Sequence, residues 1–315
     1  MTLTLENPSP ARSADDRISR LSDVSLRRVV EPDEQVPGHV RDGQIVADEL
    51  LSVAGLGFEL SPEQRAVLSR EETAAITRAG IALEGMLIAA LGMYVAEHPR
   101  VTDPRVVYAL HEMGEETRHS RLFVRLVDQL APQAVDPFAG RLGQWLMRRI
   151  ARAMQKDHLM MAILVLAGEE IPDLIAKRAI DHPDSDDFLR AVNTYHRQEE
   201  ARHIAFARVV LGEFWAGASR RQRLRAKIVL PLLIQGLFEM LVHPGVYAAV
   251  GLPAWRTWVK VNASEVRRAL RHDSSRPVLR ALVAAGAFDA DHVPSRWRRL
   301  TGLTRSDPGG RSPAV

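Results

Sequence analysis

The sequence predicts an all-α protein, with a four-helix bundle core followed by additional C-terminal helices. The chain has 315 residues, of which 46% are hydrophobic, which suffices for one large helical domain. From Ser61 onward the apolar residues follow an almost continuous helical pattern, and proline-containing breaks divide that pattern into long segments. Long helices joined by short connections are typical of a bundle.

The chain divides into an N-terminal arm, one helical domain and a tail. Residues 1–45 mix Ser, Pro, Asp and Arg without an apolar segment, so we expect a partly disordered arm with no signal peptide or anchor. Residues 46–304 form the single domain, with the bundle core at about residues 60–215. Residues 305–315 are expected to be a flexible tail.

The breaks place the helices in order. Ser61 is a good N-cap, with Pro62 at the first helical position and Gln64 at the third, so the first bundle helix begins there. The second begins near Asp103, after two closely spaced prolines. The remaining predicted helices cover about 141–180, 185–216, 220–250, 254–271 and 276–287.

The first bundle helix contains a segment, Ala79 to Ala96, that is apolar apart from Glu84. A helix buried all round in a soluble protein explains it better than a membrane span. The chain has no cysteine, which excludes disulfides, iron–sulfur clusters and thiolate sites and agrees with a cytoplasmic location. A net charge of +3 and the absence of a recognition motif give no support for nucleic-acid binding.

One pentad occurs twice, as Glu115-Glu116-Thr117-Arg118-His119 and as Glu199-Glu200-Ala201-Arg202-His203. On an α-helix, a Glu and a His three positions apart face the same way. Each copy therefore presents a carboxylate and an imidazole that can bind one metal ion. Duplication predicts a centre with two metal ions.

Each pentad follows an isolated acid in an apolar helix. Glu84 precedes the first, and the pair Glu169-Glu170 precedes the second. Burying an unpaired carboxylate costs several kcal/mol, so these acids require a proton, an arginine or a cation. Four ionised glutamates balance two divalent ions, and ligands without sulfur favour iron, with manganese as the alternative. Spacing weakly favours Glu169 over Glu170.

A further histidine, His196, shares a helical face with Glu200 and His203 and is a candidate seventh ligand. The corresponding position in the first half is Glu112, which predicts unequal surroundings for the two metals.

This doubled motif resembles that of the p-aminobenzoate N-oxygenase family of ferritin-like di-iron oxygenases, over roughly residues 60–215. The resemblance implies a ferritin-like bundle and assigns the iron ligands to Glu84, Glu116, His119, Glu169, His196, Glu200 and His203. The family usually has Asp where this chain has Glu115 and Glu199; these acids should accept a hydrogen bond from a ligand imidazole, with Arg118 and Arg202 neutralising them.

The resemblance implies an O2-activating enzyme that oxidises the nitrogen of a small amine, especially an arylamine, through hydroxylamine and nitroso compounds towards a nitro product. The chain contains no flavin, nicotinamide or iron–sulfur motif, so an external electron donor is expected. A homodimer is expected by resemblance, and neither a nucleic acid nor a membrane is expected as a partner.

Two alternatives stay open. The same ligands suit C–H hydroxylation or desaturation of a small molecule, and iron storage of the ferritin type is a less favoured interpretation. Gln235, Glu239 and His243 fall at four-residue steps in an otherwise apolar segment. They either line a substrate pocket or form a polar stripe at the end of a helix.

Overall fold

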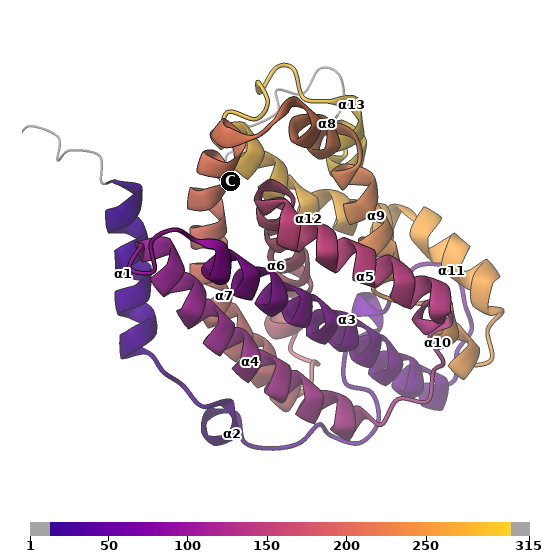
Figure 1. Cartoon of the computed structure of the whole chain (residues 1–315). Coiled ribbons are helices and arrows are strands. Elements are labelled where there is room, and N and C mark those ends of the chain that lie inside the picture. The colour runs from indigo at the N-terminus through magenta and orange to yellow at the C-terminus, as the bar shows by residue number, and fades with distance from the viewer. Residues whose placement is uncertain (1–12, 304–315) are drawn as a thin grey trace, which may run out of the picture.

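The computed structural model describes residues 13–303, and within them it contains helices and no strand (Figure 1). The core consists of α3 (Pro62–Glu97), α4 (Pro104–Leu130), α6 (His158–Asp181) and α7 (Asp187–Gly217). α3 pairs with α4 and α6 pairs with α7, while contacts of α3 with α6 and of α4 with α7 join the two pairs. The predicted all-α bundle is confirmed.

The other elements connect or cover the bundle. α5 (Arg141–Lys156) is the crossover between the two helix pairs and packs against α3. α12 (Glu265–Ala284) packs on α6 and α7. The remaining elements within the described residues are α1 (Ala14–Arg27), α2 (Pro32–Gln35), η1 (Asp48–Leu50), η2 (Pro137–Ala139), α8 (Arg220–Ile228), α9 (Leu230–Met240), α10 (Pro244–Ala249), α11 (Ala254–Ala263) and α13 (Ser295–Thr301).

Side-chain caps explain where the bundle helices start. Ser61 and Gln64 form a capping box at the start of α3, as the sequence predicts. The single helix predicted over residues 141–180 is wrong, because the chain breaks at Asp157. That residue has an extended backbone, and its carboxylate accepts the backbone N–H of Met160, so it ends α5 and caps α6.

The segment expected to be a partly disordered arm contains a packed helix. Ser13 caps α1, and this helix buries Ile18 while it packs against α4 and α7. The hydroxyl of Ser25 accepts a hydrogen bond from Nε of Arg202 at 3.2 Å. The buried face of the amphipathic helix α1 therefore packs against the surface of the bundle. The tail expected at residues 305–315 lies outside the described residues.

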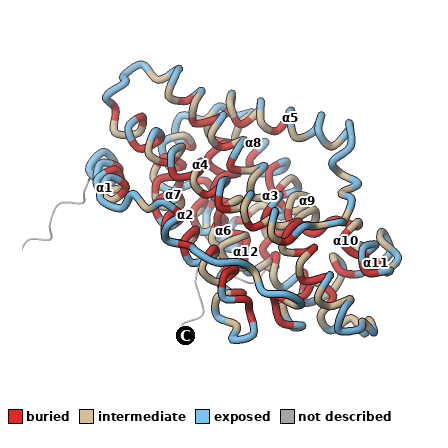
Figure 2. Tube along the Cα trace, turned by 90° about the horizontal axis from the view of Figure 1, so that it is seen from below, coloured by how far each residue is buried: buried red, intermediate tan, exposed pale blue. Residues whose placement is uncertain are grey.

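Two stretches, Pro62–Glu97 and Leu230–Ala249, are long and apolar enough to cross a membrane by length and composition alone. Only 28% of the apolar window in the first stretch is buried, so the expectation of a helix buried all round is wrong (Figure 2). One side of α3 lines an internal cavity, described below, and another faces outward, which explains the low burial.

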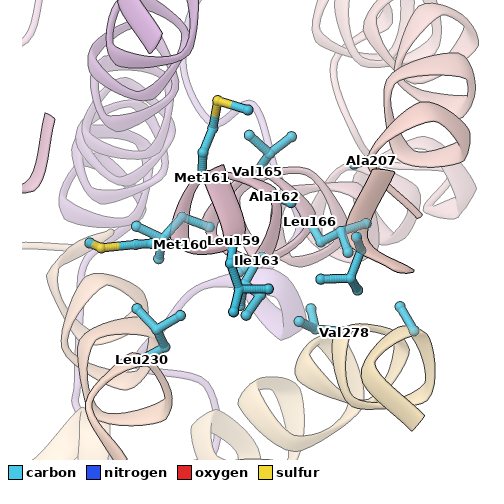
Figure 3. Close-up of a cluster of buried hydrophobic side chains, with 14 of the residues drawn as sticks. Leu159, Met160, Met161, Ala162, Ile163, Val165, Leu166, Ala207, Leu230 and Val278 are labelled. Atoms are coloured by element: carbon cyan, nitrogen blue, oxygen red, sulfur yellow. The ribbon is translucent and has the colours of Figure 1, made fainter. Parts of the chain in front are cut away.

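The first half of α6 forms the centre of the hydrophobic core. Its residues from Leu159 to Ala167 are all buried, and Figure 3 shows those that it labels close to Ala207 of α7, Leu230 at the start of α9 and Val278 of α12. Contacts with these helices hold this segment in place, while Leu164 and Ala167 border the cavity described below. The acids that follow it in the sequence are thereby positioned in the bundle interior.

Gly168 allows close contact between α6 and α3 immediately before these acids. A Cβ at this position would lie 2.2 Å from Cδ2 of Leu83, next to Glu84. We expect Gly168→Ala to destabilise the fold by about 1–3 kcal/mol and to lower iron content, because overpacking must shift Leu83 or the helices. Thermal unfolding and metal analysis measure both effects.

The matched control is Gly212→Ala on α7, where an added Cβ meets no atom within 4 Å. We expect this variant to be neutral or stabilising, since alanine favours the helix over glycine. Leu83→Ala should relieve the defect of Gly168→Ala. A defect that persists in the double variant would show that crowding against Leu83 is not its cause.

Candidate metal centre

All seven residues predicted as metal ligands lie together in the bundle interior. α3 contributes Glu84, α4 contributes Glu116 and His119, and α6 contributes Glu169, while α7 contributes His196, Glu200 and His203. Each is buried, with at most 9% of its surface exposed. They form three overlapping groups in which the potential ligand atoms lie within 4.8 Å of one another.

The two Glu-x-x-His pairs form the central group. Nδ1 of His119 lies 3.2 Å from Oε2 of Glu116 and 3.1 Å from Oε1 of Glu200. Nδ1 of His203 lies 3.0 Å from Oε1 of Glu116 and 3.1 Å from Oε2 of Glu200. Each carboxylate therefore lies between the two imidazoles, an arrangement that suits carboxylates shared between two cations.

The outer nitrogen of each imidazole is held by the other copy of the motif. Nε2 of His119 lies 3.0 Å from Glu199, and Nε2 of His203 lies 2.8 Å from Glu115. A proton on Nε2 that is donated to these carboxylates leaves the lone pair of Nδ1 directed at the central group. The two halves of the chain thus orient each other's imidazoles.

Arginines hold these outer acids ionised. Glu115 accepts a hydrogen bond from Arg202 at 2.8 Å, and Glu199 lies 3.4 Å from both Arg118 and Arg202. Burial raises the pKa of Glu115, but His203 and Arg202 outweigh it and bring that pKa down to about 2. The acceptor role predicted for Glu115 and Glu199 agrees with these contacts.

His196 lies at the side of the central group. Its Nε2 lies 3.1 Å from Oε1 of Glu200 and 3.7 Å from Oε1 of Glu84. Glu169 shares a group with His196 and Glu200, whereas Glu170 forms an ion pair with Arg208. The structure therefore places Glu169 among the candidate ligands and Glu170 outside them, a choice for which the sequence indicated only a weak preference.

The residues present fit a pair of divalent cations. Oε1 of Glu84, of Glu116 and of Glu200 is buried without a hydrogen-bond partner. Burial raises the pKa of Glu84 and raises that of Glu169 well above its ordinary value, so the protein alone does not support both charges. Carboxylate and imidazole donors without sulfur suit iron or manganese.

Glu112 is a buried acid at the centre to which the sequence assigned no role. It is 1% exposed, and its Oε2 has no hydrogen-bond partner. Burial, the main cause, raises its pKa to about 8, which favours its neutral form. It precedes Glu116 by one turn of α4, at the position that corresponds to His196 in α7. This four-residue spacing is the feature of the sequence from which its place at the centre could have been predicted.

A cavity of about 480 Å³ reaches the centre at Glu84, Glu169 and His196. Mostly apolar residues line it, among them Leu83, Met86, Met147, Ile150, Met154, Leu164, Ile234 and Phe238. Its size and apolar lining suit a small organic molecule.

Of the three residues predicted for a pocket, His243 lines this cavity and Gln235 and Glu239 do not. The face of α9 that reaches the cavity carries Ile234, Leu237 and Phe238, one residue out of phase with the polar pair. Gln235 instead donates to Glu239 at 2.8 Å, and neither residue lines this cavity.

Glu72 is a polar group in the cavity wall outside the metal ligands. It accepts hydrogen bonds from the backbone N–H and the hydroxyl of Ser52, and burial raises its pKa to about 7. A carboxyl whose pKa is raised by folding binds its proton more tightly when folded. The stability from this protonation is therefore fully present below about pH 4.5 and is lost as pH rises through about 7.

We expect Glu72→Gln to reduce this loss of stability with pH. The amide stays neutral, so at pH 8 the variant should gain up to about 3 kcal/mol relative to wild type, with little gain at pH 5. Urea unfolding of the iron-loaded proteins at the two pH values measures the difference. Glu49→Gln, at an exposed site, is the control; an unchanged pH dependence in Glu72→Gln would contradict the assignment.

This chain is similar to one protein family and to several mycobacterial proteins. The family model of the p-aminobenzoate N-oxygenase AurF matches residues 12–286. Uncharacterized proteins of Mycobacterium tuberculosis (strain ATCC 25618 / H37Rv) and Mycobacterium bovis (strain ATCC BAA-935 / AF2122/97) are each 28% identical over 185 residues. These residues are 58% of this chain and 54% of each relative, so the match spans about half the length of these curated relatives. Because the family match includes every helix of the bundle, the chain belongs to the p-aminobenzoate N-oxygenase AurF family.

Proposed function

We propose that this protein is a non-haem di-iron oxygenase that uses O2 to oxidise the nitrogen of a small amine, in particular an arylamine, through hydroxylamine and nitroso compounds towards a nitro product. One observation carries the proposal: four bundle helices bring seven buried carboxylate and imidazole donors together at the end of an apolar cavity. Membership of an N-oxygenase family supports the choice of nitrogen as the oxidised atom.

The ligand set of the proposal comprises Glu84, Glu116, His119, Glu169, His196, Glu200 and His203. When bound, two iron ions supply the redox chemistry that activates O2. Glu115 and Glu199 keep the two imidazoles in one tautomer and orientation, and Arg118 and Arg202 keep these acids charged.

The cavity determines where the substrate meets the centre. It borders Glu84, Glu169 and His196, so an amine in the cavity approaches from that side of the ligand cluster. The aliphatic and methionine side chains exclude water and favour an apolar ring, which suits an arylamine better than a charged alkylamine.

The proposed oxidation requires a source of electrons. Among the described residues the site holds no group able to store electrons apart from the proposed metals, so we infer an external electron donor. We also propose a homodimer and a cytoplasmic location. No nucleic-acid partner is proposed, since no motif for one occurs in the sequence.

Incubation of the iron-loaded protein with p-aminobenzoate, a reductant and ¹⁸O2 tests the proposal. We expect mass spectrometry to detect products with labelled oxygen on nitrogen, and no product from protein without iron. Products oxidised only at carbon would favour the hydroxylase alternative. Iron that accumulates well beyond about two ions per chain without substrate oxidation would favour storage.

A further inference from the structure

Two stretches of the chain outside the metal centre are charged with one sign only. Residues 137–156 contain five Arg or Lys side chains, residues 214–238 contain five more, and neither stretch contains Asp or Glu. The first covers α5, and the second covers α8 and most of α9. The whole chain has a net charge of +3, so the remainder is acidic on balance. The two stretches therefore carry the net positive charge of the chain.

The fold brings the C-terminal end of α5 close to α8. The carboxylate of Asp157, directly after α5, accepts hydrogen bonds from Gln222 and Arg225 of α8, both at 3.0 Å. Within residues 13–303, this is the one carboxylate within 4.0 Å of any of the ten cations. Of the other nine, eight are exposed and have no carboxylate within 4.0 Å among the described residues, whereas Arg223 is half-buried and packs on the ring of Trp215.

Large apolar side chains lie exposed among these cations. On α5, Leu142 is 78% exposed, Trp145 50% and Leu146 43%, at a spacing that places them on one edge of the helix. On α8 and α9, exposed apolar residues follow at four-residue steps: Leu224, Ile228 and Leu232. Figure 2 shows α5 at the edge of the molecule, exposed along most of its length.

We propose that this cationic–apolar surface, formed by residues 141–156 and 220–232, docks peripherally on an anionic lipid surface. Lipid headgroups offer continuous negative charge to the arginines, and the interface below them accepts exposed leucine and tryptophan side chains. A helix with arginines beside an apolar edge is typical of segments that lie in the plane of a membrane surface.

Other occupants fit less well. A second copy of the chain related by a two-fold axis would oppose surfaces of the same charge, which costs energy. A nucleic acid would match the charge but leave Leu142 and Leu224 without apolar partners. From the sequence we expected no membrane partner; peripheral docking requires no membrane-spanning segment.

Docking would place the cavity at the lipid surface. The inner side of α5 contributes Met147, Ile150 and Met154 to the cavity wall, while the outer edge carries Trp145 and its neighbours. One helix therefore separates the proposed lipid contact from the space that leads to the metal centre.

Flotation of the iron-loaded protein with vesicles tests the proposal. We expect binding to phosphatidylcholine mixed with phosphatidylglycerol, weak binding to phosphatidylcholine alone, and release at high salt. Arg148→Gln/Arg149→Gln/Arg152→Gln should lower partitioning about tenfold or more. Leu142→Ser/Trp145→Ser/Leu146→Ser should do the same by removing the apolar contact.

Matched controls carry equal changes elsewhere. Arg17→Gln/Arg20→Gln/Arg27→Gln removes three exposed charges from α1, and Val101→Ser/Val124→Ser/Val135→Ser removes three exposed apolar side chains. Both should bind like wild type. Absent binding, equal binding to the two vesicles, or equal losses in the controls would overturn the proposal. So would light scattering that shows a dimer which Leu142→Ser/Trp145→Ser/Leu146→Ser converts to monomer.

Discussion

Replacing His203 by alanine is expected to lower the amount of bound iron and to remove nearly all substrate oxidation. His203 is completely buried, and its Nδ1 lies about 3 Å from both Glu116 and Glu200. Losing this imidazole leaves one end of the central group without a nitrogen donor. Iron content should fall from about two ions per chain to about one or fewer, and turnover should fall about a hundredfold or more. Metal analysis after anaerobic loading and product formation measure the two effects.

Two further variants make this result specific. His111→Ala lies on α4 and outside the groups of candidate ligands, and it should retain iron and activity. Glu115→Gln keeps His203 but weakens its acceptor, so we expect an intermediate loss of about 10- to 100-fold. A His203→Ala protein that still binds both irons and oxidises substrate would show that the metal centre lies elsewhere.

Most of the candidate ligands were predictable because the signal is local, whereas the assignment of His196 rested mainly on the resemblance to the family. A Glu and a His three positions apart share a helical face whatever surrounds them, and an acid such as Glu84 in an apolar helix must face the interior. Because the pentad and its preceding acid occur twice, four helices were expected to carry ligands. The start of α3 was predictable for a similar reason, since Ser61 and Gln64 act within one turn.

The features that could not be predicted depend on contacts between distant segments. No spacing reveals that Glu115 holds His203 and Glu199 holds His119, because these pairs are 88 and 80 residues apart. The break at Asp157 is only partly local, since that carboxylate caps α6 and is also bonded to Gln222 and Arg225 of α8. A helical pattern alone continues through it.

The residues that line the cavity could not be predicted from the sequence for the same reason. Gln235 and Glu239 stood out in an apolar segment, yet the direction they face is set by how α9 packs on α6. A small change in helix rotation decides which of two neighbouring faces reaches the cavity. The low burial of α3 could not be predicted either, because composition shows how apolar a helix is but not which parts of the protein cover it.

Removing the metal is expected to destabilise the fold strongly. A cation that binds only the folded state adds about 4 kcal/mol per site when its concentration is a thousand times Kd. For two sites in a chain of this size, the midpoint of thermal unfolding should fall by roughly 10 °C or more on chelation. Readdition of Fe(II) or Mn(II) should restore it, whereas Mg²⁺ should not, since imidazole suits the transition ions.

Replacing two of the buried carboxylates by neutral amides should reduce the loss of stability that follows metal removal. Burial raises the pKa of Glu84 and Glu169, so at neutral pH the metal-free fold bears the cost of ionising them or of binding protons instead. Glu84→Gln/Glu169→Gln removes that cost and also removes two ligands. Without metal the double variant should therefore unfold at a higher temperature than metal-free wild type, and added Fe(II) should raise its midpoint little. Glu49→Gln/Glu59→Gln, which removes two acids outside the candidate ligand groups, should leave both midpoints close to those of wild type. If the double variant is no more stable than wild type without metal, repulsion between buried acids is not what the metal relieves, and its stabilising effect must come from ordering the helices instead.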